Sequence, residues 1–343
     1  MSGFATQRFQ ELSAGTGFRL GDLRSPEDLR TGLGGAIVGQ PQAVDAVVRA
    51  LTIAAVGLRD PYRPIASLLL VGPTGVGKTE LARQVARHVR GDVDSLCRID
   101  MNSLAQEHYA AALSGAPPGY AGSKEQFSLF DRDTVEGSAS RPGVVLFDEV
   151  EKAHPTVLRA LLQILDTGRL RLASGTTTID FRNAIVLLTS NLGSREVHDL
   201  QRQSVRRVAA AVRRRGPRDV VLDRVRSFFD PELLNRFDEI VVFDSVDRGT
   251  ARTVVDREID RLIATVADRG IDCVVTESAR DELLRRAFDI RYGVRALHRA
   301  LRVHLVAPIA AVLADTRGDP PRRLLVDVVD GEVAVAVMGG GAS

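Results

Sequence analysis

One stretch of the sequence has the residue types and spacing that bind a phosphate chain. It begins at Gly72, ends with Lys78 and Thr79, and directly follows the apolar run Ser67–Val71. Glycines let successive backbone N–H groups turn toward a phosphate, and a helix that starts behind the loop adds its positive dipole end. The lysine can then reach the outer phosphates, and the threonine hydroxyl can bind Mg²⁺. The predicted phosphate-binding residues are Gly72, Pro73, Thr74, Gly75, Val76, Gly77, Lys78 and Thr79.

Two carboxylates follow another apolar run, Val144–Phe147, which is typical of a buried strand. Ligands of open parallel sheets bind at the carboxyl ends of the strands, where Asp148 and Glu149 would lie. We expect Asp148 to hold Mg²⁺ through water and Glu149 to polarise an attacking water molecule. An Asp-Glu pair also ends many ordinary strands, and the phosphate loop upstream favours the catalytic interpretation.

Asn191 closes a third apolar run, Ala184–Leu188, within the sequence Thr189-Ser190-Asn191. A polar tip on a neighbouring strand can bridge the γ-phosphate and the attacking water. On its own, Thr-Ser-Asn is more often a turn or a helix cap. The order of the three motifs favours ATP hydrolysis, with Lys78, Glu149 and Asn191 among the catalytic residues.

Short apolar strands that alternate with helices must position these motifs. Helical periodicity runs from Pro41 to about Gly57 and from Thr79 to Val89. This alternation predicts an α/β fold with a parallel sheet between helices. From about Asp247 the pattern changes to the helices 250–269, 277–287 and 295–314 and the strands 323–328 and 333–337.

The sequence therefore predicts two domains. Residues 31–245 form the phosphate-loop domain, and residues 246–338 form a small, mostly helical C-terminal domain with a short β element. Residues 1–30 are predicted to be a partly disordered extension, and residues 339–343 a flexible tail.

The composition excludes several functional classes. The chain has 343 residues, 44% of them apolar, and a net charge of only +2, so it shows no overall polyanion-binding character. It contains no uninterrupted run of about 18 apolar residues and no signal peptide, which predicts a cytoplasmic protein without a membrane span. Cys97 and Cys273 stand far apart and are predicted to be buried, unreactive thiols.

Over a longer range the chain resembles the AAA+ ATPases of the Clp/ClpB chaperone class, in particular their second, C-terminal ATPase module. The resemblance runs from about residue 34 to the end of the small domain. Its segments are Ile37–Gln40, Gly57–Pro64, Gly72–Leu81, Gly115–Gly122, Phe147–Pro155, Leu161–Leu170, Phe181–Asn183, Thr189–Ser194, Pro231–Phe243 and Tyr292–Arg295.

The resemblance implies a homo-hexameric ring that hydrolyses ATP with Mg²⁺ and threads unfolded or misfolded polypeptide through an axial pore. It makes Arg236 an arginine finger for the neighbouring subunit and Arg295 a sensor of the nucleotide in its own subunit. Tyr120 corresponds to the pore-loop tyrosine that grips the substrate. The adenine pocket would be lined by Ile37, Val38, Gly39 and Gln40.

The chain also departs from that class. It lacks the N-terminal domain, the first ATPase ring and the middle domain, which implies a stand-alone single ring if Met1 is the natural start. After the pore tyrosine, the class usually has a second aromatic residue and acidic residues, and here the sequence differs and reads Ser123-Lys124-Glu125-Gln126-Phe127. Phe127 or Phe130 could replace that aromatic, although core packing is the alternative that we favour.

Two kinds of partner are disfavoured by sequence. No aliphatic-Gly-hydrophobic tripeptide occurs between Ser194 and Arg236, which argues against a peptidase partner. The arginine-rich segment 202–226 could bind nucleic acid, but it has no interleaved aromatic residues before Phe228 and Phe229. A solvated surface is its simpler interpretation. The alternatives to protein threading are an AAA+ motor on nucleic acid and a nucleotide-dependent assembly switch, and an adaptor is left open.

Overall fold

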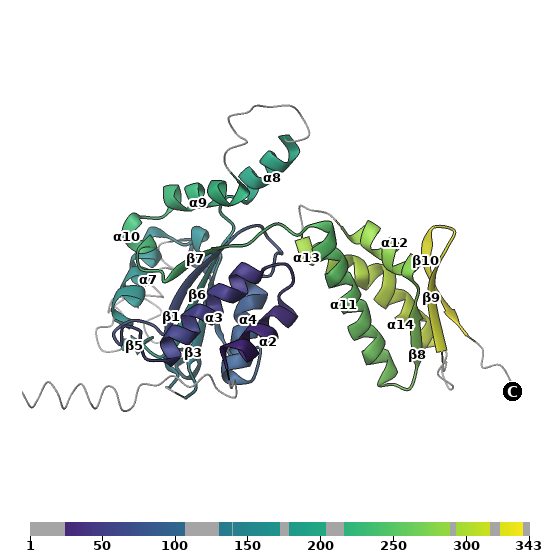
Figure 1. Ribbon diagram of the computed structural model, residues 1–343, viewed down its shortest axis with the longest axis horizontal. Coiled ribbons are helices and arrows are strands. Elements are labelled where there is room, and N and C mark those ends of the chain that lie inside the picture. The colour runs from purple at the N-terminus through teal and green to yellow at the C-terminus, as the bar shows by residue number, and fades with distance from the viewer. Residues whose placement is uncertain are drawn as a thin grey trace, which may run out of the picture. The chain divides into compact units, whose positions relative to one another are not determined.

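The computed structural model describes residues 25–106, 130–138, 140–171, 178–203, 216–288, 293–315 and 323–338. The chain divides into two compact units (Figure 1). The first ends at Asp244 and the second begins at Ser245, with Thr74–Val76 grouped with the second. The predicted boundary at residues 245 and 246 lies beside this division.

A parallel five-stranded sheet forms the centre of the first unit. Its strand order is β2 (Cys97–Asp100), β3 (Gly143–Asp148), β6 (Ala184–Ser190), β1 (Ala66–Val71) and β7 (Glu239–Val242). Every residue of β1, β3 and β6 is buried, because helices cover both faces and the strands are rich in Val, Ile and Leu. The predicted α/β fold is confirmed.

Helices cover the two faces of this sheet. On one face α3 (Pro41–Ala55) packs on β1 and β7, α4 (Lys78–Arg90) packs on β3 and β6, and α2 (Pro26–Ala36) packs on both helices. The other face joins one buried apolar cluster with α7 (Pro155–Thr167), α8 (Ser194–Gln203) and α9 (Pro217–Phe228). The smaller elements are η1 (Met101–Leu104), α6 (Arg132–Glu136), η2 (Val150–Lys152), α10 (Pro231–Leu234) and the hairpin of β4 (Arg169–Arg171) with β5 (Thr178–Asp180).

Aromatic packing answers one question that the sequence left open. Phe130 is 3% exposed and packs edge-on against Phe147 and Phe181, with ring centroids 6.4 and 5.5 Å apart. Its predicted core role is therefore confirmed, while Phe127 lies outside the described residues. Cys97 and Cys273 are buried as well, and burial raises the pKa of both thiols.

The first unit begins earlier than predicted. Helix α2 starts at Pro26, and the Ser25 hydroxyl caps it by accepting the Asp28 N–H at 3.1 Å. Leu29 and Leu33, one turn apart, are completely buried. The predicted start at residue 31 was too late, because two leucines among polar residues and glycines give a weak periodic signal. Residues 1–24 lie outside the described residues.

The second unit places three helical stretches beside a three-stranded sheet. The helices are α11 (Arg248–Ala267), α12 (Glu277–Ala287) and a run of α13 (Gly293–Leu301), the π-helical turn η4 (Arg302–Val306) and α14 (Ala307–Asp315). β9 (Arg323–Val329) pairs in parallel with β8 (Asp272–Val275) and antiparallel with β10 (Glu332–Val337). The three predicted helices and two predicted strands are present, and β8 was missed because it has only four residues.

One helical run among the described residues, Gly293–Asp315, has the length and apolar composition of a membrane-crossing helix. A single run of this kind is weak evidence, because helices inside folded domains meet the same criteria. The run contains Arg295, Arg299 and Arg302, and its first part packs against α11 and α12. The absence of a membrane span stays a prediction.

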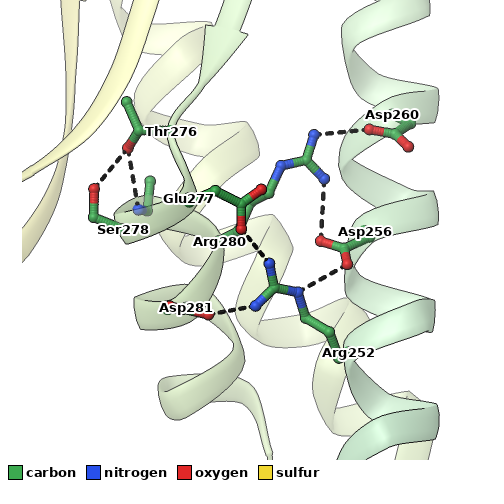
Figure 2. A network of polar contacts seen from close by, with 9 residues as sticks. Arg252, Asp256, Asp260, Thr276, Glu277, Ser278, Arg280 and Asp281 are labelled. Atoms are coloured by element: carbon green, nitrogen blue, oxygen red, sulfur yellow. Dashed lines mark hydrogen bonds and ion pairs between the residues drawn. The ribbon is translucent and has the colours of Figure 1, made fainter.

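Ion pairs join α11 to α12 (Figure 2). Arg252 Nε lies 2.8 Å from Asp256 Oδ2, and its terminal nitrogens contact Glu277 and Asp281. Arg280 binds the other oxygen of Asp256 at 3.1 Å, and Asp260 at 2.8 Å. A carboxylate shared by two guanidinium groups fixes the relative position of the two helices more firmly than a single exposed pair would.

A second charged cluster makes the stability of this unit depend on pH. The Arg285 and Arg286 guanidinium groups bind Glu282, with Arg285 the larger cause, and lower the pKa of that carboxyl to about 2. Because this pKa is depressed in the folded state, the resulting stabilisation is present above the ordinary pKa of 4.5 and is lost as the pH falls toward about 2.

We expect Glu282→Gln to destabilise the protein at pH 7 and to have a smaller effect at pH 3. At pH 3 the unfolded wild-type chain binds a proton at Glu282 that the folded chain mostly does not, so the wild type loses part of its advantage. Urea unfolding at both pH values measures the difference, with the exposed Glu232→Gln as the control. An equal difference at both pH values would contradict the assignment.

Candidate nucleotide-hydrolysis site

The predicted phosphate loop connects β1, which lies between β6 and β7 in the sheet, to α4. Gly72 has φ 150°, and a Cβ atom there would lie 2.7 Å from the Phe243 carbonyl oxygen, because the Phe243 N–H donates to Val71 at 2.7 Å. Gly77 caps α4 with φ 104°. Only glycine adopts these conformations without strain, and the close approach at Gly72 leaves no room for a side chain.

Lys78 and Asn191 meet at the carboxyl edge of the sheet. The Lys78 side chain is largely buried, and its Nζ donates to the carbonyls of Gly72 at 2.6 Å and Pro73 at 2.7 Å and to Asn191 Oδ1 at 2.9 Å. The Asn191 Nδ2 in turn donates to Glu149 Oε1 at 3.0 Å. One amide group therefore joins the predicted phosphate-binding lysine to the predicted catalytic base.

The backbone of Glu149 lies in the left-handed region, with φ 60°. This conformation costs a non-glycine residue about 1–3 kcal/mol and persists only when its surroundings enforce it. Thr189 supplies part of that enforcement, since its hydroxyl accepts the Glu149 N–H at 3.0 Å and donates to Asp148 Oδ1. One hydroxyl on β6 thus orients both acidic residues at the carboxyl end of β3.

Asp148 forms an ion pair with Arg98, a residue of β2. Arg98 Nη2 and Nε lie 2.6 and 3.1 Å from Asp148 Oδ2. The predicted Mg²⁺ ligands are this carboxylate and the Thr79 hydroxyl, and both are the oxygen donors that Mg²⁺ prefers when phosphates and water complete its shell. The donor set fits Mg²⁺, provided that Arg98 releases Asp148 when the ion binds.

Sequence reasoning missed three residues of this site: Arg98, Thr189 and Glu151. Glu151 Oε1 accepts the backbone N–H of Asn191 at 3.0 Å and so fixes the position of that residue. Apolar and charged residues alternate along β2, and this pattern could have indicated that the Arg98 side chain is exposed. Cys97 and Ile99 are buried, and Arg98 and Asp100 are exposed. The role of Thr189 has no sequence signal, because it depends on the register between β3 and β6.

The residues predicted to line the adenine pocket lie between α2 and α3. Ile37 is buried, Gly39 has φ 73°, and Gln40 is 1% exposed. The Gln40 amide exchanges two hydrogen bonds with the backbone of Asp244, with its Nε2 2.9 Å from the carbonyl oxygen and its Oε1 3.0 Å from the N–H. This segment is therefore tied to the chain that follows β7, and its contact with adenine stays a prediction, as does that of Val38.

Three predicted site residues remain: Arg236, Arg295 and Tyr120. Arg236 precedes β7, at the amino end of the sheet, and its Nε lies 2.8 Å from Asp166 Oδ1 on α7. Arg295 is exposed on α13 of the second unit. Tyr120 lies outside the described residues, as do Arg206, Arg207 and Arg213–Arg215 of the arginine-rich segment.

A phosphate loop after β1, an acidic pair at the end of β3 and an asparagine after β6, the strand between them, define a P-loop nucleoside triphosphatase of the AAA+ type. Two family models match the chain. One, described as the AAA domain (Cdc48 subfamily), matches residues 63–240, and the other, the C-terminal D2-small domain of ClpB protein, matches residues 246–325. The chain belongs to the Clp/ClpB family of AAA+ ATPases.

Individual relatives agree with this assignment. The chain is 55% identical over 312 residues to an ATP-dependent protease ATP-binding subunit-like protein of Rhodococcus erythropolis, covering 90% of this chain and 89% of the relative. It is 44% identical over 288 residues to the similarly named AmiB of Pseudomonas aeruginosa, covering 81% and 77%. Chaperone protein ClpB 2 of Thermosynechococcus vestitus is 41% identical over 298 residues, but the match covers 87% of this chain and only 32% of ClpB 2.

A solved structure supports the fold in the same way. A closed-state cryoEM reconstruction of Hsp104:ATPyS and FITC casein matches with a TM-score of 0.76 and 32% identity. The match covers 91% of this chain and 51% of the Hsp104 chain. The Clp/ClpB resemblance and the fold expected from the sequence are both confirmed.

We expect Gly72→Ala to weaken nucleotide binding by more than about 10-fold, because the added Cβ would force the loop away from Phe243. Titration with a fluorescent ATP analogue measures the affinity. Gly34→Ala on α2 is the matched control, because a Cβ there meets no atom within 4 Å. Wild-type affinity in Gly72→Ala would show that the loop does not need this conformation to hold phosphate.

Proposed function

We propose that this AAA+ ATPase is a protein unfoldase or remodelling chaperone that works as a hexameric ring and threads polypeptide through its axial pore. The observation that supports a ring is the position of Arg236 in the sheet. The Asp238 N–H donates to the Ser67 carbonyl at 2.9 Å, which fixes the chain just after Arg236 at the amino end of β1. The phosphate loop begins at Gly72, beyond the carboxyl end of the same strand.

These two ends are too far apart for Arg236 to serve its own phosphate loop. At about 3.3 Å per residue, the five steps from Ser67 to Gly72 span about 16 Å along the strand. An arginine at the amino edge can instead meet the carboxyl edge of a second copy, and such a head-to-tail contact forms a ring when the rotation between subunits closes. Hydrolysis would then require a neighbour, as with other arginine fingers supplied in trans.

The residues at the carboxyl edge support Mg²⁺-dependent hydrolysis of ATP. Glu149 would accept the proton of the attacking water, with Asn191 holding its carboxylate in place. Lys78, with three contacts at its ammonium group, would bind the outer phosphates. Asp148 and Thr79 would hold Mg²⁺, which when bound supplies charge neutralisation for the phosphates.

Polypeptide is the substrate that the relatives favour. The Hsp104 reconstruction contains casein, and the ClpB relatives are named chaperones. The sequence Gly119-Tyr120-Ala121-Gly122 has an aromatic residue between glycines, and an aromatic ring can contact many kinds of polypeptide side chain. Two relatives are named protease-subunit-like proteins, but the tripeptide expected for a peptidase contact does not occur between Ser194 and Arg236. We therefore propose remodelling without a peptidase, in the cytoplasm, with an adaptor left open.

Nucleic acid is a weaker substrate candidate. Of the arginine-rich segment, the structure describes the side chains of Arg218, Arg224 and Arg226. Arg224 pairs with Glu196 at 3.3 Å, and Arg226 pairs with Asp223 at 3.7 Å. Arginines that pair with neighbouring carboxylates are typical of a solvated helical face.

We expect unfolded casein to stimulate the steady-state ATPase rate, and Tyr120→Ala to remove the stimulation while leaving the basal rate unchanged. A pore-loop aromatic couples hydrolysis to a passing chain but does not touch the nucleotide. A coupled phosphate assay with and without casein, and with single-stranded DNA, measures the rates. Stimulation by DNA that survives Tyr120→Ala would favour the nucleic-acid motor and refute threading.

We expect Arg236→Ala and Glu149→Gln each to be nearly inactive alone and to recover activity when mixed. In a ring, a Glu149→Gln subunit can offer its intact Arg236 to the intact site of an Arg236→Ala neighbour. Random mixing in equal amounts makes about a quarter of the junctions competent. If the mixture gives only the sum of the two separate rates, Arg236 acts within its own subunit or not at all.

A further inference from the structure

The segment Gly57–Pro64 contacts the backbone of Arg236 through the side chain of Arg63. Arg63 is 27% exposed, and its Nη2 donates to the carbonyl oxygen of Arg236. Its Nε donates to the carbonyl of Leu165 at 3.0 Å, near the C-terminal end of α7. One guanidinium group therefore ties the residue before Asp166 to Arg236 itself.

Arg236 is held from several directions at this point. Its carbonyl oxygen also accepts the Ser67 hydroxyl at 3.2 Å, and its Nε lies 2.8 Å from Asp166 Oδ1. Asp238 clamps the next part of the chain, since its Oδ2 accepts both the N–H and the hydroxyl of Ser67, at 2.6 and 2.9 Å. Backbone and side chain of Arg236 therefore both have contacts within the subunit, and the side chain as a whole is 37% exposed.

Arg63 is itself fixed by the rest of its segment. The Arg59 Nη1 donates to the carbonyls of Arg63 at 3.3 Å and Arg182 at 3.1 Å. At the end of α7, Gly168 lies so close to Tyr62 that a Cβ atom would be 2.6 Å from the Tyr62 carbonyl oxygen. The segment therefore packs tightly against the C-terminal end of α7, and Arg63 has little freedom to move.

We propose that Arg63 is a positioning residue for Arg236. By joining α7 to the chain before β7, it sets the position of the Arg236 side chain at the amino edge of the sheet. A planar guanidinium fork can hold two carbonyl oxygens in fixed directions, which the single ammonium group of lysine cannot do. The inference rests on the proposed function, in which Arg236 reaches the nucleotide of a second copy of this chain.

The expected effect is large because catalysis depends steeply on geometry. A displacement of about 1 Å can cost about 10²-fold in rate. Removal of Arg63 leaves Arg236 present but less precisely placed, so hydrolysis should slow. Nucleotide affinity should stay the same, because the phosphate loop lies at the other end of β1.

The test is a double-mutant cycle with Arg63→Met and Arg236→Ala, measured as kcat and as the Kd of a fluorescent ATP analogue. We expect Arg63→Met to lower kcat by about 10- to 100-fold with the wild-type Arg236 present, and by less than about 2-fold in the Arg236→Ala protein. The Kd should change by less than about 2-fold, and Arg63→Lys should not restore kcat.

Arg90→Met is the matched control. Arg90 is also a partly buried arginine of the first unit that donates to a backbone carbonyl, that of Pro142 at 2.8 Å, and it binds the Ser95 hydroxyl at 2.7 Å. Its loss should cost comparable packing but leave kcat within about 3-fold of wild type. Size-exclusion chromatography with ATP reports assembly for every variant.

The outcomes separate this inference from the function on which it rests. An equal loss of kcat from Arg63→Met in both backgrounds would overturn the positioning role, and so would loss of the ring in Arg63→Met but not in Arg90→Met. If Arg63→Met does not bind ATP, Arg63→Lys replaces it in the cycle with the same expectation. A wild-type kcat in Arg236→Ala would overturn the proposed function and this inference together.

Discussion

The hydrogen bonds of β1 fix the positions of the predicted phosphate loop and of the chain that carries Arg236. At its carboxyl end, β1 pairs with β6 and leads into the phosphate loop, so that Lys78 meets Asn191. At its amino end, Ser67 binds the chain that carries Arg236. One short, completely buried strand therefore sets the distance between the predicted phosphate loop and the arginine proposed to serve the phosphate loop of a neighbouring subunit.

The polar groups at the carboxyl edge hold one another before any ligand takes part. Asn191 joins Lys78 to Glu149, Thr189 joins Glu149 to Asp148, and Arg98 balances the charge of Asp148. Such mutual support keeps charged side chains in defined positions inside a partly buried site. It also means that these side chains need little reorganisation when phosphates replace some of these contacts, which is a general condition for electrostatic catalysis.

Sequence reasoning reached the elements whose signal is local. The apolar runs of β1, β3 and β6 and the polar residues after them predicted the sheet and its reactive edge, because parallel strands place their carboxyl ends together. It missed α2 and the four-residue strands β2, β7 and β8, because short or sparsely apolar elements lack a clear period. Arg98, Thr189 and Arg63 could not be assigned roles, because each acts on a residue far away in sequence, and only strand register and helix packing bring the partners together.

The left-handed backbone conformation of Glu149 affects which substitutions a laboratory selection for stability would favour. A glycine at this position would relieve the strain and gain on the order of 1 kcal/mol, while removing the carboxylate. A population selected for heat resistance alone would thus be expected to accumulate Glu149→Gly and to lose hydrolysis. Retention of glutamate in such a population would indicate that ATP hydrolysis is also under selection. The residue at position 149 therefore distinguishes selection for thermal stability from selection for activity.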